Sequence, residues 1–226
     1  DRRLRIPGYR MANPGEAKAA MAALLSGAGA RIEGPAIFDL PHRDDGAVTL
    51  AVTDAPADTG PARLVYHPQC HVLGVGCARG TPPGDLAALV REALAEAGIA
   101  AGSLACVATL DLKADEPAVI ALARDLGVPL RVFTAAELEA ETPRLETPSE
   151  VVFAEVGCHG VSEGAALAAA GPEAALVLPK RKTANATAAL ARAPAPVTAL
   201  RGCARGRLSI VGIGPGQAAW RTPEAS

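Results

Sequence analysis

Short apolar runs alternate with amphipathic stretches through the middle of the chain. The apolar runs cover residues 71–76, 104–110, 130–133, 151–156 and 174–178. Amphipathic stretches with a helical period lie between or after them, over residues 84–97, 116–126, 161–170 and 183–193. Continuous apolar runs are typical of strands buried on both faces of a parallel sheet. The sequence therefore predicts one α/β domain over residues 69–193, with a mainly parallel sheet and helices on both faces.

The segments on either side of this domain have different patterns. Residues 1–68 are interpreted as a lead-in segment, with a helix predicted over 14–26 and strands over 48–52 and 63–66. Residues 194–206 hold too few apolar side chains to pack, so we expect an interdomain linker there. Residues 207–226 begin with a new apolar strand pattern, which we interpret as the start of a further domain.

Composition and charge narrow the classes of partner. The 226 residues are 50% hydrophobic but only 3% aromatic, which favours close-packed α/β layers over an aromatic-rich β-sandwich. A formal net charge of −2 gives no electrostatic reason to expect nucleic acid or an anionic membrane surface as a partner. No apolar run reaches the length of a membrane span. The 5 cysteines include no C-x-x-C pair, which fits a reducing compartment, so we expect a cytoplasmic protein.

Candidate chemistry lies in four loops that follow predicted strands, where the ligands of open α/β sheets collect. In the first loop, Gly76 is followed by Cys77 and Arg79. Its glycines predict either a close backbone approach to an anion or a tight turn with a positive φ. The second loop brings Thr109, Lys113 and Glu116 to a strand end. Glu116 is predicted either to act in the site or to stabilise the positive end of the next helix.

The third and fourth loops continue the same edge of the predicted sheet. In the third, Gly157 precedes Ser162 and Glu163, which are expected either to cap the following helix or to join the site. The fourth combines cations with hydroxyl and amide side chains, at Lys180, Lys182, Asn185 and Thr187. Clustered cations at a strand end favour a polyanionic ligand over a solvated run of charge.

Two more specific kinds of site are also considered, a metal site and a thiolate nucleophile. A metal site is conceivable from His67, Cys70, His71 and Cys77, but their spacing matches no zinc pattern. Cys77, or Cys158 beside His159, is a candidate thiolate nucleophile, although neither has an orienting acid in the sequence. A structural role for these cysteines is the favoured interpretation.

At these four loops the sequence resembles the C-terminal domain of the CbiG family of cobalt-precorrin-5A hydrolases and its stand-alone relative CobE. The resemblance covers about residues 69–193 and lies in the Gly74-Val-Gly-Cys77 motif, the Thr109-x3-Lys113-x2-Glu116 stretch, the Gly157 turn with Glu163, and the Lys180–Lys182 cluster with Asn185 and Thr187. Residues 14–68 are similar to the middle of the longer hydrolases, and residues 207–226 to the opening of tetrapyrrole methyltransferases, most closely precorrin-3B methyltransferase.

The resemblance implies a function in cobalamin biosynthesis on a precorrin or cobalt-precorrin. The implied reaction opens the ring-A lactone and releases acetaldehyde. Arg79, Lys113, Lys180 and Lys182 are then expected to pair with ligand carboxylates, Glu116 or Glu163 to activate water, and Thr187 to hold an oxyanion.

No cofactor is implied for the main domain. Cobalt would belong to the substrate, and S-adenosylmethionine would serve only a complete methyltransferase. The expected partners are a tetrapyrrole and other corrin-pathway enzymes. The alternative is a non-catalytic corrinoid-binding or carrier module. A generic nucleotide-binding protein is disfavoured because the chain has no Walker pattern.

Overall fold

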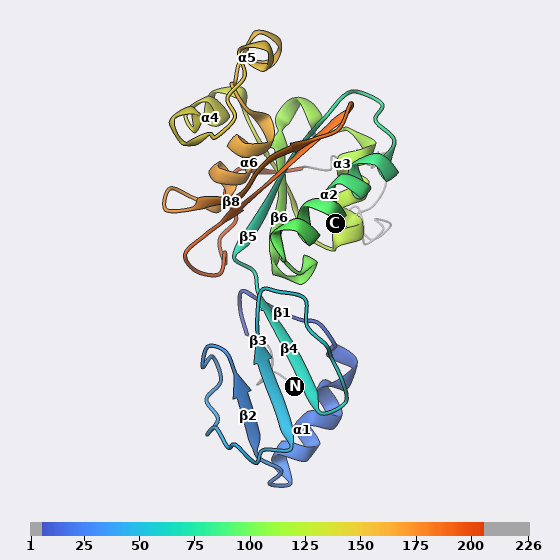
Figure 1. Ribbon diagram of the computed structural model, residues 1–226, viewed down its shortest axis with the longest axis vertical. Helices are drawn as coiled ribbons and strands as arrows, with labels where there is room; N and C mark the ends of the chain where they lie inside the picture. The colour runs from blue at the N-terminus through green and yellow to red at the C-terminus, as the bar shows by residue number, and fades with distance from the viewer. Residues whose placement is uncertain (1–5, 206–226) are drawn as a thin grey trace, which may run out of the picture.

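Two β-sheets, joined by one continuous stretch of chain, organise the structure (Figure 1). The computed structural model describes residues 6–205 of the chain. In Figure 1 the smaller sheet lies below the larger one, and the chain passes between them from strand β4 to strand β5. The smaller sheet comes from the segment before residue 69, and the larger from the α/β region that follows.

The smaller sheet has the strand order β1-β4-β3-β2, and helix α1 packs on it. β1 and β4 are antiparallel, while the other neighbours are parallel. Leu50, Leu64 and Tyr66 are buried in its core. The predicted helix and the two predicted strands are confirmed, and the segment has an apolar core of its own. The elements are β1 (Tyr9–Met11), η2 (Pro14–Glu16), α1 (Ala17–Leu25), β2 (Ala30–Glu33), β3 (Val48–Val52) and β4 (Arg63–Pro68).

The larger sheet has six strands in the order β10-β7-β6-β5-β9-β8. Its central strands β5, β6 and β7 are parallel, as the apolar runs predicted. β9, β8 and β10 join it in antiparallel pairings, so the sheet is mixed rather than mainly parallel. The strands are β5 (His71–Cys77), β6 (Leu104–Leu110), β7 (Leu130–Phe133), β8 (Ala175–Lys182), β9 (Ala186–Arg192) and β10 (Cys203–Ala204).

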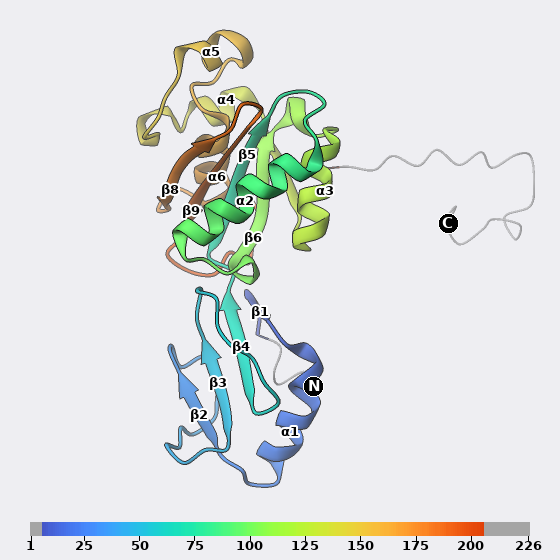
Figure 2. The same ribbon diagram turned by 45° about the vertical axis from the view of Figure 1, so that its right-hand side comes forward.

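Helices cover both faces of the larger sheet, which confirms the predicted α/β class. α2 (Pro83–Ala97) and α3 (Pro117–Leu126) pack on one face, where Leu73 and Val75 of β5 meet Leu86 and Leu89. Figure 2 shows both helices on the same side of the strands. α4 (Ala135–Glu139) and α6 (Val161–Ala170) pack on the other face, with α5 (Glu150–Val156) beyond them. Short 3₁₀ turns are η3 (Ala101–Ser103), η4 (Asp111–Lys113) and η5 (Thr142–Arg144). Among the helices described, none has the length and apolar character needed to cross a membrane.

Two predicted elements are wrong in type. Residues 151–156, predicted as a buried strand, form helix α5, in which Val151 and Phe153 are exposed. Residues 183–193, predicted as a helix, contain strand β9. Alanine favours helices, but tertiary structure overrides that preference here, because β9 pairs with β5 and β8 and is covered by α2 and α6.

The segment after β9 also differs from the prediction. The N–H of Val197 donates to the carbonyl of Gln69 at 3.0 Å. Arg131 of β7 donates to the carbonyl of Arg201 at 2.8 Å, and β10 pairs with β7. Up to residue 205 the chain therefore runs along the larger sheet and does not leave the domain as a free linker. The predicted methyltransferase-like start at 207–226 lies outside the described residues.

Direct hydrogen bonds join the smaller sheet to the larger domain. The guanidinium of Arg10 donates to the carbonyls of Leu126 and Gly127, at 3.0 and 2.8 Å. The carbonyl of Asp54 accepts the backbone N–H of Ala100 at 2.8 Å and the hydroxyl of Ser103 at 3.0 Å. These contacts lie at the end of the larger sheet where the parallel strands β6 and β7 begin.

Candidate functional site

A cleft of about 460 Å³ lies where β5 and β6 end, between the β8–β9 hairpin, the start of α6 and helix α5. This is the edge at which ligands of α/β sheets are expected. The cleft brings together several residues that the sequence analysis singled out, namely Gly76, Cys77, Lys113, Lys180, Lys182, Asn185 and Thr187. Residues of all four loops thus line one cleft, since Ser162 of the third loop lies there as well.

Three lysines give the cleft an excess of positive charge. Lys113 ends the turn that follows β6, and Lys180 and Lys182 come from β8. The ammonium of Lys180 donates to the carbonyl of Thr147 at 2.8 Å. Within residues 6–205, neither Lys113 nor Lys182 forms an ion pair, and Glu155 is the single carboxylate among the lining residues. The cleft is therefore suited to an anionic ligand.

The floor of the cleft is built by β5 and the hairpin. The hydroxyl of Thr187 on β9 lies 3.4 Å from the carbonyl oxygen of Gly76 on β5. A Cβ at Gly76 would lie 2.9 Å from that hydroxyl oxygen, so a larger residue would displace it. The carbonyl of Asn185 accepts the N–H of Ala78 at 2.8 Å. Gly76 thus belongs to an extended strand, and close packing rather than a positive-φ turn explains the glycine.

Glu163 does not face the cleft. Its side chain is buried, and its carboxylate accepts hydrogen bonds from the N–H groups of Glu146, Thr147 and Lys180, at 3.0, 3.0 and 2.8 Å. The hydroxyl of Thr147 adds a fourth donor at 2.8 Å. Burial by itself would raise the pKa of Glu163, but these donors outweigh it and hold the pKa below its usual value. The carboxylate ties β8 and the loop before α5 to α6, which is a positioning role.

Glu116 and Arg79 are also engaged away from the cleft. Glu116 is buried at the start of α3 and accepts the N–H of Gly80 at 3.0 Å. Arg79 pairs with the exposed carboxylate of Asp115 at 2.7 Å and lies 3.6 Å from Glu116. Hydrogen bonding to Asp115 is the main reason that the pKa of Arg79 is raised. These contacts fix the loop between β5 and α2.

Two further predicted residues have structural contacts. The hydroxyl of Thr109 is buried and donates to the carbonyl of Val75 at 2.7 Å, so it links β6 to β5. Gly157 ends α5 with φ +78°, a left-handed conformation that favours glycine. Neither residue lines the cleft.

A known protein family matches the part of the chain that contains the cleft. The model of the family described as cobalamin synthesis G C-terminus matches residues 71–191, more than half of the chain. The chain belongs to this family. The match spans β5 to β9 and so includes every strand that borders the cleft. The resemblance of residues 69–193 to this family is thereby confirmed, and with it a function in cobalamin biosynthesis. The resemblances of residues 14–68 and 207–226 stay predictions.

Individual members of the cobalamin synthesis family show how far the similarity extends. Protein CobE from Sinorhizobium sp is 56% identical over 120 residues, which cover 53% of this chain and 78% of CobE. Cobalt-precorrin-5A hydrolase from Priestia megaterium is 31% identical over 131 residues, which cover 58% of this chain but only 34% of the hydrolase. The chain thus matches about a third of the length of that hydrolase.

A solved structure agrees with these sequence matches. The crystal structure of CobE, described as a protein from the cobalamin (vitamin B12) biosynthetic pathway, is 38% identical with a TM-score of 0.53. The match covers 56% of this chain and 92% of that one.

The structure disfavours both the metal site and the thiolate nucleophile that were considered for the cysteines. No group of three or more metal-ligating side chains occurs within residues 6–205, so His67, Cys70, His71 and Cys77 make no cage there. Burial raises the pKa of the Cys77 and Cys158 thiols, which disfavours the reactive thiolate.

Alkylation of the native protein at neutral pH is therefore expected to modify Cys203 first, because its side chain is exposed while Cys70, Cys106 and Cys158 are buried. Peptide mass spectrometry after a short iodoacetamide treatment measures the order. The same treatment in denaturant is the control, in which all five thiols should react. Modification of Cys158 before Cys203 would restore the nucleophile interpretation.

Helix α5 and its N-cap Ser149 supply lining residues to which sequence reasoning assigned no role, among them Ser149, Val152, Glu155 and Val156. The available signal was Ser149 before Glu150, since serine is a common N-cap and an acidic residue favours a helix start. In the structure the Ser149 hydroxyl accepts the N–H of Val152 at 3.4 Å. His159 anchors the end of α5, stacking on Phe153 with centroids 4.5 Å apart.

Proposed function

We propose that the cleft binds a corrin-ring intermediate through carboxylates on the edge of the ring. The observation that carries this proposal is the convergence of Lys113, Lys180 and Lys182 on one cleft that has Glu155 as its only described carboxylate. Corrin precursors carry many carboxylates around an apolar ring. Leu110, Val152 and Val156 supply apolar surface in the same cleft. The ligand is thus recognised by charge at its rim and by apolar contact with its ring.

The reaction that we propose for this site is the ring-A lactone opening that the resemblance to the cobalt-precorrin-5A hydrolases implies. Water adds to the lactone carbonyl carbon, the ring C–O bond breaks, and the product carries a carboxylate and a hydroxyl group. That hydroxyl then becomes a carbonyl as the C–C bond between its carbon and the macrocycle breaks. The two-carbon unit leaves as acetaldehyde, and the macrocycle keeps the electron pair of the broken bond and takes up a proton. Glu116 and Glu163, the acids expected from the sequence, accept hydrogen bonds from backbone N–H groups. We therefore propose that Glu155, which lines the cleft, accepts the proton from water.

A second candidate is a non-catalytic corrinoid-binding or carrier module. The burial of Glu116 and Glu163 favours it, because Glu155 is then the single acid beside the cleft within residues 6–205. Incubation with cobalt-precorrin-5A followed by an acetaldehyde assay separates the two candidates. Acetaldehyde that Glu155→Gln abolishes supports the enzyme, whereas binding without acetaldehyde supports the carrier.

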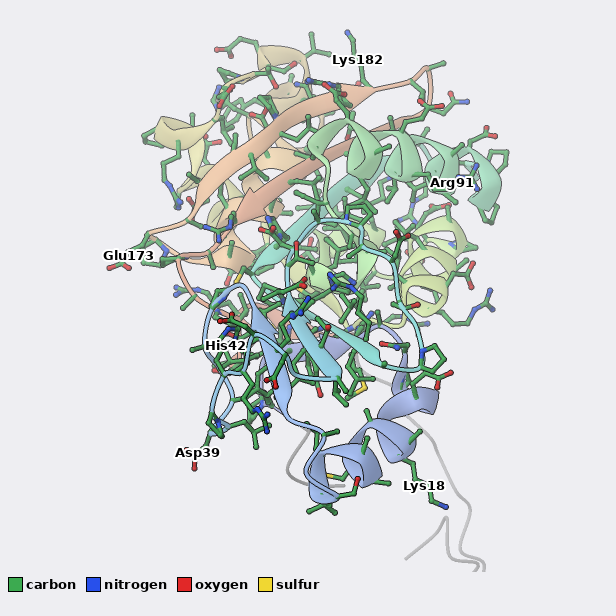
Figure 3. The ribbon with its side chains drawn as sticks, turned by 60° about the horizontal axis from the view of Figure 1, so that its bottom comes forward. Lys18, Asp39, His42, Arg91, Glu173 and Lys182 are labelled. Atoms are coloured by element: carbon green, nitrogen blue, oxygen red, sulfur yellow. The ribbon has the colours of Figure 1, made fainter. Side chains whose placement is uncertain are left out.

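Lys113→Ala and Lys182→Ala are expected to weaken binding of a cobalt corrinoid carboxylic acid about tenfold to a hundredfold, because each removes one charge-assisted contact. Visible-absorbance titration at two salt concentrations measures this, and added salt should weaken wild-type binding. Lys18→Ala is the matched control, since Lys18 lies on α1 at the opposite end of the molecule from Lys182 (Figure 3). Equal affinities for the three variants would contradict a binding role for the cleft.

The proposal also covers the cofactor, the cellular location and the partners of the protein. It assigns no cofactor to the main domain, and any cobalt enters as part of the substrate. We propose a cytoplasmic protein whose partners are the tetrapyrrole and other corrin-pathway enzymes, with neither nucleic acid nor membrane among them. Fusion to a precorrin-3B methyltransferase, which would use S-adenosylmethionine, stays a prediction from residues 207–226.

A further inference from the structure

The start of helix α6 forms part of the cleft wall. Gly160, Val161 and Ser162 all line the cleft, and α6 has 10 residues. Gly160 is the N-cap, and no side chain caps the helix, so neither Ser162 nor Glu163 has the capping role considered from the sequence. The first N–H groups of a helix have no partner within it and carry the positive end of the helix dipole. These donors therefore border a cleft that is already cationic.

The hydroxyl of Ser162 is a second, independent feature of this wall. The residue is 1% exposed, and its Oγ has no hydrogen-bond partner among the described residues. Burying a hydroxyl without a partner costs free energy, and buried polar groups in native proteins are nearly always paired. Alanine would pack as well at this position without that cost. An unpaired donor in the wall of a ligand cleft indicates that its partner comes with the ligand.

We propose that the N-terminus of α6 is a subsite for one carboxylate of the ligand. The hydroxyl of Ser162 and the first backbone N–H groups of α6 donate to the carboxylate oxygens, while Lys182 from β8 contributes charge at the same cleft. Glu163 positions the first turn of α6 beside β8, because its carboxylate accepts a hydrogen bond from the N–H of Lys180. The inference rests on the proposed function and deepens it, since it assigns one ligand carboxylate to one place in the cleft.

The test compares stability and binding in Ser162→Ala. Because the variant removes an unpaired buried hydroxyl, the midpoint of thermal unfolding without ligand is expected to stay the same or rise. Affinity for a cobalt corrinoid carboxylic acid is expected to fall about tenfold to a hundredfold. The methyl ester of the same corrinoid lacks the carboxylate charge, and its weaker binding should differ little between wild type and Ser162→Ala.

Ser103→Ala is the matched control. Ser103 is also buried, but its hydroxyl donates to the carbonyl of Asp54 at 3.0 Å, away from the cleft. This variant is expected to lower the unfolding midpoint and leave corrinoid affinity unchanged, the reverse of the result for Ser162→Ala.

Three results would overturn the subsite. Wild-type affinity in Ser162→Ala, together with weakened binding in Lys182→Ala, removes the subsite and leaves the cleft proposal standing. A drop in unfolding midpoint as large as that of Ser103→Ala, with no change in affinity, shows that the hydroxyl is structural. Absence of corrinoid binding by the wild-type protein removes the proposed function and the subsite together.

Discussion

Gly74→Ala is expected to lower the free energy of unfolding by roughly 3 kcal/mol or more, or to prevent folding of the larger domain. A Cβ at this position in β5 would lie 1.9 Å from the carbonyl oxygen of Ser162 and 2.7 Å from the backbone nitrogen of Ala166. Both contacts are with the backbone of α6, so no side-chain rotation relieves them. The helix and the central strand would have to separate, and the cleft wall at the start of α6 would move with the helix.

Urea unfolding followed by circular dichroism measures this effect. Gly84→Ala is the matched control, because Gly84 lies in α2 and a Cβ there would meet nothing within 4 Å. That substitution is expected to leave stability unchanged or raise it by about 0.5–1 kcal/mol, since alanine favours helix. Equal unfolding midpoints for Gly74→Ala and the wild type would contradict the close packing of β5 on α6.

Glu163→Gln is expected to cost about 2–4 kcal/mol of stability. The carboxylate accepts four hydrogen bonds, from Glu146, from Lys180 and twice from Thr147. A glutamine amide replaces one acceptor oxygen with an NH₂ group, which then faces donors instead of accepting from them. Thermal or urea unfolding measures the loss. Glu173→Gln, at an exposed position labelled in Figure 3, is the control and should change stability by less than about 0.5 kcal/mol.

The same carboxylate predicts a dependence of stability on pH. Its pKa in the folded protein lies below the value in the unfolded chain, so the unfolded state binds the proton more readily as the pH falls. The contribution of Glu163 is thus fully present above the ordinary glutamate pKa of 4.5 and is lost as the pH drops below it. In Glu163→Gln the unfolding free energy should fall less steeply over that range. Parallel acid profiles for the two proteins would contradict the assigned hydrogen bonds.

The length and the surroundings of each apolar run decided whether its secondary structure could be predicted from the sequence. β5 and β6 were predictable because their side chains are buried on both faces, as continuous apolar runs require, and β7 ends in the buried pair Val132 and Phe133. Residues 151–156 have a similar composition but expose Val151 and Phe153, and short apolar runs do not distinguish a strand from a helix. The alanines of β9 favour a helix locally, but the pairing of this segment with β5 and β8 makes it extended.

The sequence predicted which loops meet at the candidate site, but not which contacts their carboxylates and hydroxyls make. The rule that ligands collect at strand ends placed Lys113 and Lys182 together correctly. It could not show which way a carboxylate points, and Glu163 and Glu116 turn toward backbone N–H groups instead of the cleft. The sequence left open whether Ser162 caps the helix or joins the site, because an unpaired hydroxyl can be recognised only when its surroundings are known.

The position of β9 bears on how the chain folds during synthesis. β9 lies directly beside β5, with Val72 opposite Ala191, so the first and last parts of the domain must meet. Until residues 186–192 leave the ribosome, β5 is an apolar edge strand with one side unpaired, the kind of edge that promotes aggregation. Such distant pairings also slow folding. We therefore expect nascent chains of this protein to depend on chaperones until the β8–β9 hairpin is complete, and the cleft to form only at that late stage.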